Sequence, residues 1–312
     1  MHPALSVIFF TVASGAGFGL VMLTISLHLL GGVPGMEGSG TLAAILVGIV
    51  LATLGLLAST LHLANPKNAW RAFFRFRTSW LSREAVFSVL FYPCVMLYAL
   101  GLWLFGGELA WWSAIAGTLA MLLALATVFT TGMIYASLRT IPQWNSPLVP
   151  ANYLLLGLAS GAVILTALTV AFGGSAETVA TMALVLLVIA GIAKGVYYFW
   201  IGKPQGPTIN TALGITRSRI KMLEPGQSSD SFLNREFSFQ AAAERILRLR
   251  LVVHLCGFIL PFLMLVVLLR TDIAMVALLA PLVVIVGLLA ERWLFFAEAR
   301  HVVNLYYGRQ QC

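Results

Sequence analysis

The chain has 312 residues, of which 60% are apolar and 10% are charged, and its mean hydropathy is +0.94. This composition excludes an ordinary soluble globular domain, in which about 25% of residues are charged. The formal net charge is +8. We expect membrane lipid, and no nucleic acid, as the neighbour of this cationic chain.

Eight apolar stretches are each long enough to cross a bilayer as a helix, which takes about 20 residues. They are too long and too uninterrupted for the alternating pattern of barrel strands. The sequence therefore predicts an all-α integral membrane protein, a single domain over residues 1–312 built as a bundle of transmembrane helices. The predicted spans are residues 5–30, 41–64, 84–106, 110–137, 150–172, 177–200, 251–270 and 273–298. The first stretch lacks a basic start and a clear cleavage site, so we expect it to stay as a helix.

Glycines four residues apart occur in three of these spans. Small residues at this spacing let helix backbones approach closely in a membrane. We predict that these pairs serve helix packing and bind no ligand. The pairs are Gly15 and Gly19, Gly157 and Gly161, and Gly191 and Gly195.

The linker at residues 65–83 follows the second span and interleaves basic with aromatic side chains, among them Arg71, Arg77 and Trp80. Rings at headgroup depth with cations in water are typical of a membrane interface. This composition suits anchoring to the lipid surface. It equally suits a docking platform for a soluble partner, or a rim around a ligand that enters from the bilayer.

Residues 201–250 form the longest predicted loop, and its last part, from Glu244 to Arg250, is predicted to be a charged helical stretch. A loop of this length in a compact bundle is either disordered or functional. We favour contact with an extrinsic subunit, so that residues 65–83 and 201–250 both become partner-docking segments.

The basic residues are distributed asymmetrically between the two ends of the predicted spans. Of the 19 Lys and Arg residues, only Arg270 falls at the opposite end from the others. An even number of spans places both termini at the basic end. By the positive-inside rule, the termini and the docking segments are cytoplasmic.

Several ionisable side chains fall near the basic ends of the spans, where a buried charge is a functional hypothesis by default. His62 closes the second span, and His254 and His301 are predicted at a similar depth. The presence of Lys194 and Arg292 within spans is explained by snorkelling of the side chains to the interface, or by a structural ion pair, as well as by a catalytic role. Glu291 and Glu298 lie seven residues apart, on one face of the last helix.

A quinone needs an apolar slot, a donor to its carbonyl oxygens and a proton path to water. A neutral histidine with a carboxylate beside it meets this need. His62 with Glu84 and the neighbouring arginines has these parts at the right depth. Haem b held between His62 and His254 is the competing use of the same histidines.

A metal-binding protein and a transporter are two further classes of function that the sequence does not favour. The three cysteines, at 94, 256 and 312, are scattered and form no iron-sulfur or other metal motif, so we expect no metal site in this chain. A transporter would place its site at the midplane between repeated halves. We find no convincing repeat, and the polar groups lie at one end.

Short motifs along nearly the whole chain resemble the membrane-anchor subunits of the dimethyl sulfoxide reductase family of molybdenum enzymes. Each motif is modest alone, and their order across the spans is more specific. They are Met1–Ala4, Ser59–Pro66, Ser79–Glu84, Met133–Tyr135 and Thr140–Trp144.

The resemblance implies an anchor without haem in the inner membrane of a bacterium. It also implies two partners: an iron-sulfur subunit with four clusters and, through it, a catalytic subunit with molybdopterin guanine dinucleotide. A quinone site, for ubiquinone or menaquinone, is implied near the end of the second helix, which maps onto His62 and the following loop.

The tail, residues 291–301 and 305–308, resembles the branch of cytoplasmic sulfite dehydrogenases. We therefore predict the quinone-reactive anchor of a sulfite:quinone oxidoreductase, with the anchor of a dimethyl sulfoxide reductase that oxidises quinol as the alternative. His62 and Glu84 are the predicted catalytic residues. The predicted quinone-binding residues are His62, Asn65, Arg71, Arg77, Trp80, Glu84, Lys194 and Glu298.

Overall fold

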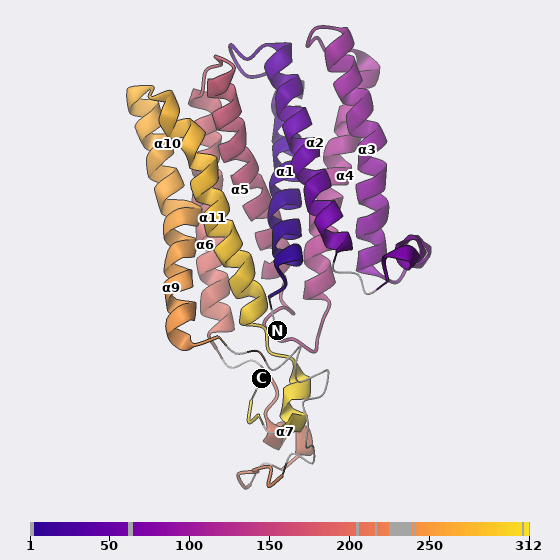
Figure 1. Cartoon of the computed structure of the whole chain (residues 1–312), viewed down its shortest axis with the longest axis vertical. Coiled ribbons are helices and arrows are strands. Elements are labelled where there is room, and N and C mark those ends of the chain that lie inside the picture. Colours follow the sequence, from indigo (N-terminus) through magenta and orange to yellow (C-terminus); the bar gives the residue numbers. More distant parts are fainter. Residues whose placement is uncertain are drawn as a thin grey trace.

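The computed structural model describes residues 3–61, 65–203, 206–215, 217–224, 239, 241–307 and 309–311. Within these ranges, eight helices are long and apolar enough to cross a membrane (Figure 1). The only β pairing among them is an isolated bridge between Thr208 and Gln311. The predicted all-α bundle is confirmed.

Six spans are single helices: α1 (Leu5–Leu29), α2 (Gly38–Thr60), α3 (Trp80–Leu104), α4 (Trp111–Ala136), α5 (Leu148–Ala171) and α6 (Glu177–Ile201). The seventh joins α9 (Ala243–His254), a π-helical turn η2 (Leu255–Ile259) and α10 (Leu260–Thr271), and the eighth is α11 (Ala274–Ala297). Among the described residues, three short helices lie outside the spans: η1 (Pro66–Arg75), α7 (Ile209–Leu213) and η3 (Val302–Tyr307).

Helices α1 and α5 form the centre of the bundle, because each packs against α4 and α11 as well as against the other. Their backbones meet at glycines: a Cβ on Gly19 would lie 2.0 Å from the Gly157 carbonyl oxygen, and one on Gly161 would lie 2.4 Å from the Gly19 backbone. Two of the predicted glycine pairs thus pack α1 on α5. For Gly195 the prediction is wrong, because no atom of the part of the chain that the structure describes lies within 4 Å of its Cβ position.

The seventh span begins at Ala243, earlier than the sequence predicted. The predicted charged helical stretch from Glu244 to Arg250 is confirmed as the first turns of α9, and it continues directly into the apolar part of the span. The π-helical turn ends two residues before Pro261, which has no N–H to donate to the helix. At this turn Gly257 meets Gly287 of α11, whose Cβ would lie 2.2 Å from the Gly257 nitrogen.

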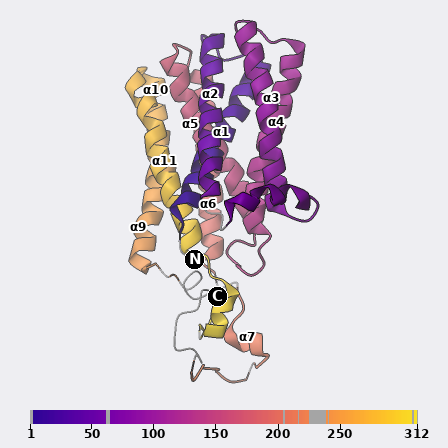
Figure 2. The same cartoon turned by 45° about the vertical axis from the view of Figure 1, so that its right-hand side comes forward.

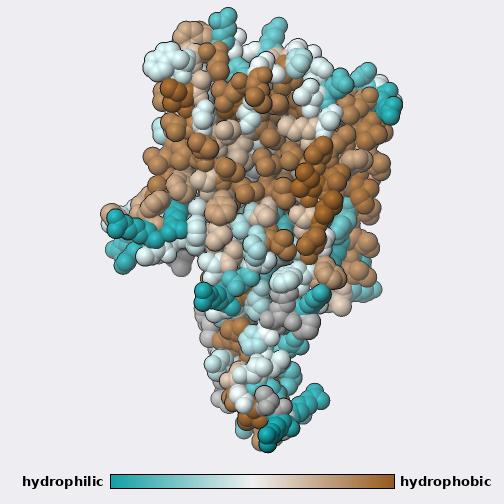
Figure 3. All heavy atoms as spheres, turned by 180° about the vertical axis from the view of Figure 1, so that it is seen from behind, coloured by the Kyte–Doolittle hydropathy of each residue, from teal (hydrophilic) through white to brown (hydrophobic). Residues whose placement is uncertain are grey.

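Both ends of the chain lie at the same end of the bundle, together with η1 and α7 (Figure 1). We call this the basic end; it carries, for example, Lys67, Arg139 and Arg300. Beyond it, α7, η3 and residues 309–311 form a projection, held in part by a hydrogen bond from Ile209 N to Gln310 O of 3.1 Å. In Figure 3, hydrophobic residues form a band across the helices, and hydrophilic residues gather on the projection.

Candidate functional site

Helix η1 protrudes sideways from the basic end beside α3 (Figures 1 and 2). The Ser82 hydroxyl donates to the Ala72 carbonyl, and the Arg83 guanidinium donates to the carbonyls of Phe76 and Arg77, at 3.0 and 2.8 Å. Ser79 caps α3 through the Ser82 N–H, so the helix starts at Trp80 and not at residue 84. These bonds fix η1 and its connection against the start of α3.

The outer face of η1 is aromatic and basic, as its composition predicted. Trp70 is 55% and Phe74 is 74% exposed, and the two rings contact each other edge to face. The Arg71 guanidinium lies 5.7 Å from the centre of the Trp70 ring. Exposed rings and cations on a helix beside the hydrophobic band suit the headgroup region of a bilayer.

Glu84 lies in the second turn of α3 and is only 5% exposed. The Thr131 hydroxyl of α4 lies 2.5 Å from its carboxyl oxygen and 2.9 Å from the Thr127 carbonyl oxygen. A hydroxyl has one proton and two acceptor positions. It therefore donates to an ionised Glu84, or accepts from a protonated one while donating to Thr127. Glu84 keeps its partner in both protonation states.

Trp80 stands one turn before Glu84, at the start of α3. Its ring packs edge to face against Phe129, which is 39% exposed, and the Arg83 guanidinium lies 4.2 Å above the Trp80 ring. Because residues four apart share one face of a helix, Glu84 lies on the same face of α3 as this aromatic edge, which reaches the outer surface of α3 and α4.

The predicted site residues fall into two separate groups. Asn65, Arg71 and Arg77 are exposed on the η1 connection, near Trp80 and Glu84 at the start of α3. We call these five residues the α3 corner. His62 belongs to the same connection in sequence but lies outside the described residues, so its predicted role stays a prediction.

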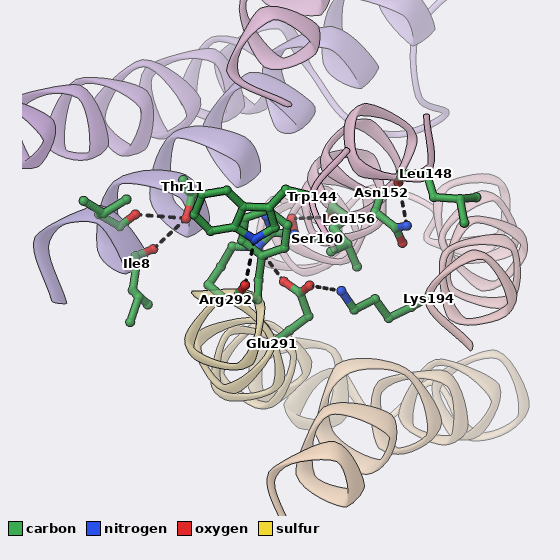
Figure 4. Close-up of polar contacts among 12 residues, drawn as sticks. Ile8, Thr11, Trp144, Leu148, Asn152, Leu156, Ser160, Lys194, Glu291 and Arg292 are labelled. Carbon is green, nitrogen blue, oxygen red and sulfur yellow. Dashed lines mark hydrogen bonds and ion pairs between the residues drawn. The ribbon is translucent and has the colours of Figure 1, made fainter. Parts of the chain in front are cut away.

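The other predicted residues, Lys194 and Glu298, belong to α6 and the end of α11. Lys194 forms an ion pair with Glu291, whose second oxygen lies 2.5 Å from the Arg292 Nε atom (Figure 4). Lys194 is 1% exposed and Glu291 is fully buried. Lys194 and Arg292 each form an ion pair with the same carboxylate, Glu291, as the structural interpretation of these two cations predicted.

Glu298 lies just beyond α11 and pairs with Arg250 of α9 at 2.5 Å. Burial raises the pKa of the Glu298 carboxyl above its usual value, and the Arg250 guanidinium opposes this rise. Glu298 is therefore easier to protonate than an exposed glutamate. In the same segment, burial lowers the pKa of the His301 imidazole.

A layer of aromatic rings separates the two groups. Tyr135 and Tyr153 stack with ring centres 5.8 Å apart, and the Arg292 guanidinium lies 4.0 Å above the Tyr153 ring. Trp144 stacks on Phe295 at 5.2 Å and donates its indole N–H to the Phe295 carbonyl at 2.9 Å. No sequence pattern assigned these rings to a site. Tyr135 and Trp144 occur in the short motifs, which was the only available signal.

His254, the described half of the predicted haem pair, lies between Tyr198 and Phe258, with ring centres 5.7 and 6.3 Å away. Its Nδ1 atom is 2.7 Å from the carbonyl oxygen of Arg250 in its own helix. Such a bond fixes the ring orientation. Because His62 is outside the described residues, haem ligation by the pair remains an open prediction.

Comparison with known proteins covers nearly the whole chain. A family model for the DMSO reductase anchor subunit (DmsC) matches residues 1–308. The chain belongs to this family. It is also 34% identical over 321 aligned positions to a subunit of the sulfite dehydrogenase of Allochromatium vinosum, covering 98% of this chain and 99% of the relative. This multi-pass membrane protein is thus an anchor subunit of the DMSO reductase family, as the short motifs indicated.

Proposed function

We propose that this anchor subunit passes electrons from a cytoplasmic molybdenum enzyme, which oxidises sulfite, to a quinone bound at the α3 corner. The observation that carries the proposal is the buried carboxyl of Glu84, which keeps a hydrogen-bond partner in both protonation states and lies on the same face of α3 as an aromatic edge at the outer surface. The similarity to a sulfite dehydrogenase subunit over 98% of the chain supports sulfite as the electron source.

The reaction balances between the subunits. Sulfite and water give sulfate, two protons and two electrons at the catalytic subunit. Quinone takes up two electrons and two protons to become quinol. The electrons pass through the iron-sulfur partner, which we propose carries four clusters and docks at the basic end, and molybdopterin guanine dinucleotide belongs to the catalytic subunit.

The residues of the α3 corner supply binding and proton transfer. Glu84 holds a proton beside Thr131 and releases it toward a quinone oxygen. The Trp80 ring, with Arg83 above it, offers a flat surface against which a quinone ring packs. His62 is the proposed donor to the other carbonyl oxygen. Lys194 and Glu298 stand beyond the aromatic layer, so the proposal leaves them out of the slot.

The basic end faces the cytoplasm in this proposal, because it holds the excess of Lys and Arg in its loops. Residues 65–83 and the described parts of 201–242 at this end are then placed to contact the iron-sulfur subunit. Protons are taken up from the side on which sulfite is oxidised.

The second candidate is the reverse flow, in which a quinol is oxidised and dimethyl sulfoxide is reduced. The description of the matching family as a DMSO reductase anchor favours it. Supplying the native complex with sulfite and a quinone analogue, or with quinol and dimethyl sulfoxide, separates the candidates. Our proposal requires turnover with the first pair.

Glu84→Gln tests the quinone site, with Glu108→Gln, in the turn between α3 and α4 at the opposite end, as the matched control. We expect intact assembly, unchanged sulfite oxidation with a soluble acceptor such as ferricyanide, and a loss of quinone-coupled turnover by about 100-fold, typical of removing a general acid. Quinone-coupled turnover at the native rate in Glu84→Gln would refute the proposed role.

A further inference from the structure

A cavity of about 530 Å³ opens at the basic end, and α6 and α9, which help to line it, lie across the bundle from α3 and η1 (Figure 1). Its walls come from the ends of α6 and α11, the start of α9, the loop between α4 and α5, and the C-terminal tail. The quinone proposal makes no use of this cavity. Its size suits a small-molecule ligand, for which pockets of about 300–1,000 Å³ are typical.

The lining of this cavity is strongly cationic. Lys203, Arg250, Arg300 and Arg309 provide four positive charges against one negative charge from Glu298, a net of +3. Glu298 is already paired with Arg250, whose Nη2 atom lies 2.5 Å from the Glu298 carboxyl oxygen. Such a lining favours an anion with several acceptor oxygens, because guanidinium groups donate in a fixed fork that matches phosphate.

The depth of the cavity points to a membrane lipid as the source of that anion. Ile201 and Ala297, which line it, are the last residues of α6 and α11, so the cavity lies where the apolar band gives way to polar residues. The adjoining outer surfaces are apolar: Phe199 of α6 is 68% exposed, and Leu247 and Leu251 of α9 are 63% and 55% exposed. Acyl chains can follow these surfaces while a headgroup enters the cavity.

We propose that this cavity binds the phosphate headgroup of an anionic phospholipid. Basic pockets between transmembrane helices on the cytoplasmic side are suited to such headgroups. A quinone ring fits this cavity poorly, because charged and amide side chains, including Gln143, dominate its lining. The bound lipid would join α6, α9, α11 and the tail at their common meeting point.

The test uses the full chain purified in detergent and stripped of lipid. The variant is Lys203→Gln with Arg300→Gln, two lining positions outside the spans. The control is Arg245→Gln with Arg248→Gln, which removes the same charge from exposed positions of α9 outside the lining. The probes are phosphatidylglycerol, cardiolipin, phosphatidylcholine and inorganic phosphate, and the readouts are native mass spectrometry and the melting temperature.

We expect phosphatidylglycerol or cardiolipin to bind and to raise the melting temperature of the native chain and of the control. Affinity should fall at least tenfold in the lining variant, as expected for the loss of two cations near a headgroup. Equal binding of phosphatidylcholine, equal weakening in the control, or equal stabilisation by inorganic phosphate would each overturn the proposal. So would an assembled complex without bound anionic lipid, because a segment of the partner subunit would then be the occupant.

Discussion

Glu291 is the side chain whose replacement should destabilise the bundle most. Its carboxylate is fully buried and pairs with two cations, Lys194 and Arg292, which are themselves 1% and 5% exposed. Glu291→Gln keeps the shape of the side chain and leaves both cations buried side by side without a counter-charge. Breaking a buried pair costs about 3–5 kcal/mol, and a carboxylate shared by two cations places this variant near 5 kcal/mol.

The matched control for this prediction is Glu244→Gln on α9. Its ion pair with Arg248 joins side chains that are 80% and 72% exposed, so its loss should cost at most about 0.5 kcal/mol. The measurement is unfolding of the detergent-solubilised chain by added sodium dodecyl sulfate. Adding Lys194→Met to Glu291→Gln removes one of the uncompensated cations and should recover part of the loss. Equal stability of the two single variants, or no recovery in the double variant, would refute the reasoning.

Two further predictions concern helix packing and pH. Gly19→Val should prevent the close contact with Gly157 and lower the melting temperature strongly. Gly195→Ala should be tolerated, because the structure shows space at its Cβ position. Equal effects of the two substitutions on the melting temperature would contradict the packing account. The pKa of Glu298 is higher in the folded state than its usual value of 4.5. Protonated Glu298 therefore stabilises the fold at low pH, and this contribution is lost as the pH rises from 4.5 through the folded-state pKa. Arg250→Gln removes the charge that opposes this rise, so its melting temperature should fall more steeply with increasing pH than that of the native chain.

The bundle was predictable from the sequence because lipid imposes length and composition on each span separately. The glycine pairs of α1 and α5 were predictable for a similar reason, since close backbone approach needs small residues at a regular spacing. Gly195 shows where that reasoning fails: the spacing does not reveal whether a partner helix faces it. The charged helix from Glu244 to Arg250 was predictable, but its continuity with the seventh span was not, because a hydropathy pattern ends where charges begin.

The candidate site was only partly predictable, because its groups come from distant parts of the chain. Glu84 was identified from depth and chemistry, but its partner Thr131 is on the next helix and is one of many threonines. Lys194 was placed near the same slot, whereas the fold pairs it with Glu291 beyond the layer formed by Tyr135 and Tyr153. Depth in the membrane can be read from a sequence, but position around the bundle depends on which helices become neighbours.

The most direct test of the proposed function is photo-crosslinking of the native complex with an azido-quinone, followed by mapping of the labelled peptide. The account predicts labelling within residues 65–84, at the α3 corner, and its loss when an excess of unlabelled quinone is added. Specific labelling only at the opposite end near Arg270, or only in the cationic cavity at Lys203 and Arg300, would contradict a quinone site beside Glu84.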